Sequence, residues 1–282
     1  MIYGILALGV YITYKILDFP DLTVDGSFPF GAAITVRLIN GFGVPAILTL
    51  PIAFLGGALV GICTGLIHVK LKVRDLLSGI IMMTGLYTIN LWVAGSGYVA
   101  IFDKDNIFNN NFVNSITPDF LVNFKNVIII FLITMVAKYL LDWYMSTKSG
   151  FLLRAVGDND TIVTSLGVDK GLVKIVGLSI ANGLVSLSGC IYAQQQRSFE
   201  ISIGTGAVVI GLASVIIGTS LFKKVTFFCV TSSVVVGSIL YKACVAVAMF
   251  AGISPNAIKL ITAVLFLIIL VIRMDRKKVK AC

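Results

Sequence analysis

The chain has 282 residues, of which 58% are hydrophobic and 12% charged, and its formal net charge is +9. A soluble domain carries roughly twice that charged fraction, and its surface could not keep so much apolar area from water. Composition therefore excludes a water-soluble fold and predicts an integral membrane protein. Inside lipid every backbone amide must be paired, which leaves helices or a closed barrel. Long apolar stretches without alternation, such as residues 127–141 and 260–272, favour helices.

Apolar stretches in chain order predict the helices that cross or enter the membrane. They are residues 2–17, 28–39, 44–67, 76–94, 127–143, 173–193, 207–222, 226–250 and 257–272. The second stretch is too short to cross a bilayer alone, and helix-breaking residues precede it. We expect an all-α fold, a single polytopic helical bundle over residues 1–282. It should have about 8–9 spans, including a broken or re-entrant N-terminal segment.

Basic residues alternate between the loops and predict the orientation of the bundle. Lys and Arg concentrate in residues 68–74, in the loop at about 144–174, at 223–224 and in the C-terminal segment 273–280. The positive-inside rule places these segments, including the C-terminus, in the cytoplasm, and it places a loop at about 95–125 outside. The net charge then needs no nucleic-acid partner. The basic C-terminal segment is also expected to contact anionic membrane lipid.

The segment at residues 17–31, LDFPDLTVDGSFPFG, combines prolines and glycines with polar side chains. Proline removes amide donors and glycine loosens the backbone, so we expect no continuous helix through this segment. Irregular backbone at membrane depth is tolerated where it lines a wet cavity or is buried in protein. Its candidate solute-path residues are Asp21, Thr23, Asp25 and Ser27. The alternative is an ordinary surface loop between two helices.

The loop at about 144–174 contains the signals of a short helix. Asp158 to Asp160 are good N-caps, and Gly167 suits the position after a helix end. A helix this short is unstable alone in water, and we therefore expect it to pack against another surface. Two interpretations remain: a coupling helix in a groove of a cytoplasmic ATPase, or a helix lying on the membrane surface.

Small and polar residues inside the apolar stretches have two possible roles. Gly57, Gly61 and Gly65 recur every four residues, which predicts close packing of a neighbouring helix. Polar side chains within or at the ends of spans could line a solute path or could bond helices together. The candidates for the path are Tyr87, Asn90, Asn182 and Gln194.

Several kinds of catalytic chemistry lack the residues they need. The chain contains no GxxxxGK[ST] phosphate-binding loop, one histidine, His68, and one glutamate, Glu200. A metal site needs several ligands in one place, so we expect no metal and no enzymatic activity. The spans carry almost no carboxylates or histidines of the kind that couple proton flow to transport. A pump built on this chain would take its energy from another subunit.

Four separated motifs carry a family likeness that covers nearly the whole chain. Residues 154–193, RAVGDNDTIVTSLGVDKGLVKIVGLSIANGLVSLSGCIYA, resemble the permease subunits of bacterial ABC importers of the branched-chain amino-acid and ribose type. The matching positions are Arg154, Ala155, Gly157, Asn159, Gly167 and Gly189. Residues 3–33, 76–95 and 204–218 look closer to the tryptophan/tyrosine branch. Where that branch tends to have Gly-Phe-Ala-Asp, residues 197–200 here read Arg-Ser-Phe-Glu, a departure at the expected outer mouth that allows a solute other than the usual one of the branch.

The resemblance implies an ATP-driven import system in the bacterial plasma membrane. This chain would be the permease, two copies of it would form the translocation path, and a small solute, an amino acid or related compound, would cross. ATP would bind to a separate cytoplasmic ABC ATPase subunit, and an extracytoplasmic solute-binding protein would deliver the solute. The expected ATPase-coupling residues are Arg154, Gly157, Asp158, Asn159 and Gly167. The competing hypothesis is a stand-alone secondary transporter or channel for a small solute.

Overall fold

A computed structural model describes residues 1–101, 104–109, 124–165, 167–222 and 229–250, with isolated positions at 260, 263, 264 and 267. The helices, in chain order, are α1 (Ile2–Val10), α2 (Val24–Phe42), α3 (Thr49–Lys70), α4 (Asp75–Ala94), α6 (Lys125–Met145), α7 (Lys148–Asp158), α8 (Asp160–Ser165), α9 (Lys170–Gln196), α10 (Ala207–Leu221) and α11 (Val230–Phe250). A π-helix, Tyr11–Ile16, continues α1, and 3-10 turns occupy Ala46–Leu48 and Ile201–Gly204.

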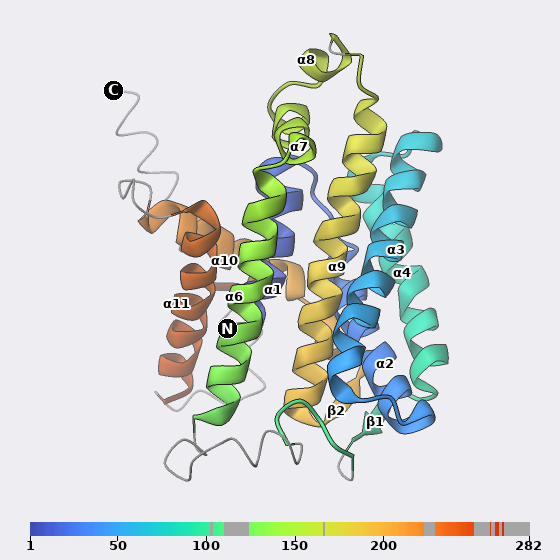
Figure 1. Cartoon of the computed structure of the whole chain (residues 1–282), viewed down its shortest axis with the longest axis vertical. Helices are drawn as coiled ribbons and strands as arrows, with labels where there is room; N and C mark the ends of the chain where they lie inside the picture. Colours follow the sequence, from blue (N-terminus) through green and yellow to red (C-terminus); the bar gives the residue numbers. More distant parts are fainter. Residues whose placement is uncertain are drawn as a thin grey trace.

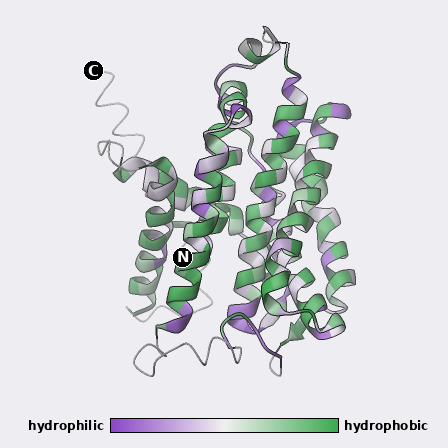
Figure 2. Ribbon diagram, viewed as in Figure 1, coloured by the Kyte–Doolittle hydropathy of each residue, from purple (hydrophilic) through white to green (hydrophobic). Residues whose placement is uncertain are grey.

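The long helices run along the longest axis of the molecule, with α7 and α8 at one end and strands β1 (Tyr98–Ala100) and β2 (Ser198–Glu200) at the other (Figure 1). Hydrophobic residues follow the length of the long helices, and hydrophilic residues gather at their ends (Figure 2). This banding is what a bilayer requires, because the apolar helix faces lie in hydrocarbon and the polar ends lie in water.

Six of the predicted stretches are confirmed as helices long and apolar enough to cross a membrane. They are Ala46–Lys70, Asp75–Ala94, Lys125–Met145, Lys170–Gln196, Ile201–Leu221 and Val230–Phe250. The count of about 8–9 spans is not confirmed. The apolar helix Ile2–Ile16 is shorter than a full span. The predicted span at 257–272, the basic pair 223–224 and the C-terminal segment 273–280 lie outside the described residues.

The expected break in residues 17–31 is shorter than predicted. Irregular backbone separates Ile16 from α2, but α2 begins at Val24 and continues through Pro29 to Phe42. Pro29 stands only one and a half turns into the helix, so its missing amide removes a single bond, to the carbonyl of Asp25. The helix survives because neighbouring protein covers this stretch: a Cβ on Gly204 would lie 2.0 Å from that carbonyl oxygen.

The glycine stripe on α3 packs closely against a neighbouring helix, as predicted, and that helix is α9. A Cβ added at Gly57 would lie 2.4 Å from the carbonyl oxygen of Asn182, and one at Gly61 would lie 2.2 Å from that of Leu178. Such contacts allow the two backbones to approach more closely than side chains would permit. This close approach of α9 to α3 therefore requires glycine at these positions, because any larger residue would clash with the α9 backbone.

A short two-stranded ribbon departs from the all-α prediction. Strand β1 pairs antiparallel with β2, with Val99 opposite Phe199, and the buried Phe199 ring anchors the ribbon in the core. Three-residue strands carry too little alternation for a sequence pattern to detect. The ribbon joins the segment after α4 to the segment after α9 at one end of the bundle.

Candidate functional site

Four of the residues predicted to line a solute path meet in one buried hydrogen-bond network. One carboxyl oxygen of Asp21 accepts a bond of 2.8 Å from the backbone amide of Thr23, and the other accepts a bond of 2.8 Å from Nδ2 of Asn182. The Oγ of Ser27 donates to Oδ1 of Asn182 at 2.6 Å. The hydroxyl of Thr23 lies 3.2 Å from that of Thr64 on α3.

The network joins the break before α2 to the interiors of α3 and α9. All five side chains are at most 4% exposed. In a membrane interior such polar groups are costly unless they are paired, and here each bonds another member of the set. Sequence reasoning missed Thr64, which contributes the α3 side of the network. The hydroxyl of Thr64 also bonds the carbonyl of Val60, four residues earlier in the same helix. The sequence therefore gave no signal that Thr64 contacts another segment.

Asp25 does not join this network. Its carboxyl oxygens accept bonds of 3.1 Å from the amide of Gly206 and 2.8 Å from the amide of Val208. Gly206 is the N-cap of α10 and Val208 lies in its first turn, where backbone amides lack acceptors within the helix. Asp25 therefore caps α10 from outside that helix, where the helix dipole favours a negative group.

The two candidates on α4 face different ways. Asn90 is buried, and its Nδ2 donates to the carbonyl of Gly26 at 3.1 Å. Its Oδ1 has no hydrogen-bond partner among the described residues. Tyr87 is 55% exposed and points away from the bundle interior, so within this chain it does not meet the other candidates.

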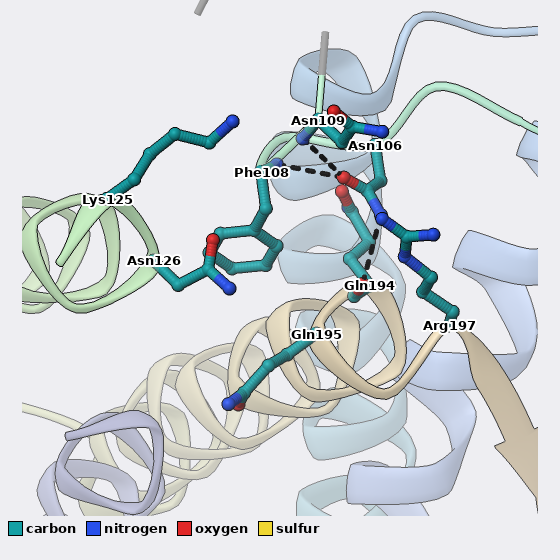
Figure 3. Close-up of a pocket in the computed structure, with 8 residues that line it drawn as sticks. All are labelled: Asn106, Phe108, Asn109, Lys125, Asn126, Gln194, Gln195 and Arg197. Atoms are coloured by element: carbon teal, nitrogen blue, oxygen red, sulfur yellow. Dashed lines mark hydrogen bonds between the residues drawn. The ribbon is translucent and has the colours of Figure 1, made fainter. Parts of the chain in front are cut away.

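Gln194 lies at the end of α9 nearest β1 and β2, beside a polar pocket of about 220 Å³ (Figure 3). Its Oε1 accepts a bond of 3.1 Å from the amide of Ile107, and its Nε2 donates to the hydroxyl of Thr49 at 2.8 Å. The described lining of the pocket has amide and cationic side chains around Phe108 and includes no carboxylate. Its lining residues are Asn106, Phe108, Asn109, Lys125, Asn126, Gln194, Gln195 and Arg197.

The predicted coupling segment contains two helices, α7 and α8. The expected helix after Asp158 is α8, and Gly167 follows it with a φ of +73°, the left-handed conformation predicted for it. Sequence reasoning missed α7, whose N-cap Thr147 accepts a bond from the amide of Gly150. Arg154, Asp158 and Asn159 are exposed at this end of the bundle. The side chains of residues 160–162 and residue 166 lie outside the described part of the chain.

Gly157 packs this segment against the end of the π-helix. A Cβ at Gly157 would lie 1.6 Å from the carbonyl oxygen of Ile16, the last residue of the π-helix. Leu17 follows and packs beside Gly177 of α9. The break begins at Leu17, and Asp21 of the buried network lies four residues further on. Sequence reasoning identified Gly157 but not its contact, because composition does not mark a π-helix.

Comparison with known proteins identifies the class of this bundle. Residues 1–271 match the family described as the permease component of the branched-chain amino acid transport system. The chain belongs to this family of membrane permeases of ABC-type transport systems, which move small solutes and are not enzymes. The predicted resemblance is therefore confirmed. No solved structure matches the chain.

The chain is similar to several individual transport permeases. The chain is 41% identical to the tyrosine transport system permease protein of Clostridioides difficile, over 95% of this chain and 86% of the relative. It is 26% identical to a probable branched-chain amino acid transport permease protein LivH of Methanocaldococcus jannaschii, over 73% of this chain and 66% of the relative. It is also 26% identical to the ribose import permease protein RbsC of Escherichia coli, over 70% and 60%.

Proposed function

We propose that this chain is the permease of an importer for an aromatic amino acid, tyrosine or a close analogue. The similarity to a tyrosine transport permease supports this solute. In the proposed arrangement, the α7–α8 end faces the cytoplasm and the β1–β2 end faces outward, where a binding protein delivers the solute. The turn after α3 and the segment around α7 and α8 carry basic residues, which supports this orientation.

The cytoplasmic ATPase docks on α7 and α8 in this proposal. Exposed Arg154, Asp158 and Asn159 offer polar contacts there, and the short α8 needs a partner surface to be stable. One observation carries the coupling: the contact between Gly157 and the Ile16 carbonyl. Because no atom separates the two backbones, a displacement of α7 must move the π-helix and the break that follows it.

The solute path passes the segment of Asp21, Thr23 and Ser27 when the permease opens. In the described state these groups satisfy one another, so the path is closed at this depth. Movement of Ile16 and Leu17 would pull Asp21 away from Asn182 and expose polar groups to the solute. The network would thus have two arrangements, one closed and one open, and the ATPase would shift the balance between them.

A second copy of the chain completes the path. The surface of α4 exposes Thr84, Tyr87 and Thr88 within a predicted span, where lipid offers polar groups no partner. We propose that this face of α4 lies against its counterpart, or against water between the two copies. A homodimer would provide both the counterpart of α4 and a water-filled space between the two copies.

Reconstitution tests the proposal. Liposomes containing the permease, its ATPase partner and the binding protein should accumulate labelled tyrosine only when ATP is present. Uptake by the permease alone would instead establish the competing hypothesis of a stand-alone carrier or channel. A cysteine at Ser27, in a background without the native cysteines, should react with a polar reagent only during turnover. Equal labelling with and without ATP would exclude it from a gated path.

A further inference from the structure

A basic pocket of about 510 Å³ lies at the end of the bundle where α3 ends and where α4 and α9 begin. It is remote from the outer pocket at Gln194, at the opposite end of α9. Its lining residues are His68, Val69, Lys72, Val73, Arg74, Asp75, Asp169, Lys170, Gly171 and Lys174. Four Lys and Arg side chains and the only histidine of the chain thus converge on one hollow that includes two carboxylates.

One of the two carboxylates is already engaged by a helix start. The carboxylate of Asp169 accepts a bond of 2.8 Å from the amide of Gly171, in the first turn of α9. Asp75 stands in the first turn of α4, where the helix dipole favours its charge. Lys72 and Arg74 form no ion pair with any carboxylate of the described residues. The pocket therefore keeps an excess of positive charge.

The turn that bears these two cations has a fixed conformation. Nδ1 of His68 lies 2.9 Å from the carbonyl oxygen of Val73, and the ring of Phe19 packs edge-on against the imidazole with a centroid distance of 5.1 Å. Lys72 has a φ of +54°, a left-handed conformation that costs a non-glycine residue on the order of 1 kcal/mol. The positive-inside rule accounts for basic residues at this end, but it requires neither a hollow nor a strained lysine on its rim.

We propose that this pocket binds a phosphate group. Lys and Arg side chains converging on one hollow suit a phosphate, which accepts several charge-assisted hydrogen bonds. The pocket lies where three helices end, the level at which phospholipid headgroups stand, and basic pockets between membrane helices bind anionic headgroups. The phosphate comes either from such a headgroup or from free inorganic phosphate. This site does not depend on the solute or on the ATPase.

Thermal unfolding of the full-length purified chain in detergent tests the site. Phosphatidylglycerol, phosphatidylcholine and inorganic phosphate are added separately, with chloride at matched ionic strength as the salt control. The double variant Lys72→Gln/Arg74→Gln removes the two cations of the turn. The control Lys15→Gln/Lys148→Gln removes two exposed charges that do not line the pocket.

We expect an anionic ligand to raise Tm of the native chain and of the control. The double variant should lose at least about tenfold in apparent affinity, and Lys72→Arg/Arg74→Lys should restore it. A shift with phosphatidylglycerol alone identifies a lipid headgroup, and a shift with inorganic phosphate identifies the free anion. No shift with either, or an equal loss in the pocket and control variants, would overturn the proposal. The Tm of each variant without ligand reports whether it folds.

Discussion

Gly157 of α7 lies directly against the carbonyl oxygen of Ile16, with room for no side-chain atom between the two backbones. The contact joins an exposed helix at one end of the bundle to the last turn of a π-helix, and the buried Asp21 network follows that turn. Helix α7 is thereby joined to a π-helix that is distant from it in sequence, and through the π-helix to the network that follows. In the proposed function, this series of contacts is the route by which a nucleotide-driven subunit would move the buried network.

The first prediction concerns this contact. Gly157→Ala places a methyl group 1.6 Å from the Ile16 oxygen, so α7 must move away from the π-helix. We expect ATP-driven uptake to fall by roughly 5- to 150-fold, the usual range of a coupling free energy between two sites. ATP hydrolysis by the assembled transporter should continue. Uptake and hydrolysis are measured on the same proteoliposomes.

Gly41→Ala is the matched control, because a Cβ at Gly41 meets only the Arg37 side chain, at 3.5 Å or more. Its uptake should equal that of the native chain. If Gly157→Ala also transports normally, the contact does not transmit the motion of α7.

The second prediction concerns the stability of the buried network. Asn182→Ala removes a donor to Asp21 and the acceptor of Ser27, leaving two buried polar groups short of a partner. The free energy of unfolding should fall by about 1–3 kcal/mol. Ser146→Ala is the control, since Ser146 is exposed and its hydroxyl bonds the Trp143 carbonyl at the end of the same helix. Denaturant titration in detergent compares them, and equal stability of the two variants would contradict a tight network.

Much of the membrane architecture could be predicted from composition, because hydropathy and loop charge can be read directly from consecutive residues of the sequence. Six spans and the close packing of the glycine stripe on α3 against a neighbouring helix follow from such local patterns. Packing partners do not. Asp21 and Asp25 stand in the same polar segment, yet one bonds Asn182 and the other caps α10, because the path of α10 decides which carboxyl group it meets.

Helix rotation sets a similar limit within α4. Tyr87 and Asn90 are three residues apart and looked equally suited to a solute path. Asn90 faces the interior and Tyr87 faces outward. A span whose hydrophobic residues surround the whole helix does not reveal which face is buried. The π-helix and the short ribbon escaped prediction for a related reason: both depend on tertiary contacts rather than on local composition.

The third prediction concerns the external cap of α10. Asp25→Ala removes the acceptor for the amides of Gly206 and Val208, so stability should fall by about 0.5–2 kcal/mol. Asp25→Asn keeps one side-chain oxygen and should lose less. Thermal unfolding of both variants gives the order, and an Asn variant as unstable as the Ala variant would argue against capping.

The fourth prediction concerns charges near the end of α6. Lys138 and Asp142 form an ion pair of 3.3 Å, and Asp142 also accepts a bond of 2.6 Å from the hydroxyl of Thr231 on α11. Lys138 is buried, so removal of Asp142 alone leaves a cation without its partner within the bundle. Because an unpaired charge costs more than a lost pair, Asp142→Leu should destabilise the chain more than Lys138→Met/Asp142→Leu does.

A double-mutant cycle measures this difference. The coupling between the two positions should be about 0.5–3 kcal/mol, within the range found for residues in contact. Thr231→Val serves as the reference for the α6–α11 bond alone, and it should cost less than Asp142→Leu because it leaves the ion pair intact. Additive effects of the Lys138 and Asp142 substitutions would mean that water or lipid headgroups already screen the pair. In that case the hydroxyl of Thr231, rather than Lys138, would be the partner that holds Asp142 in place.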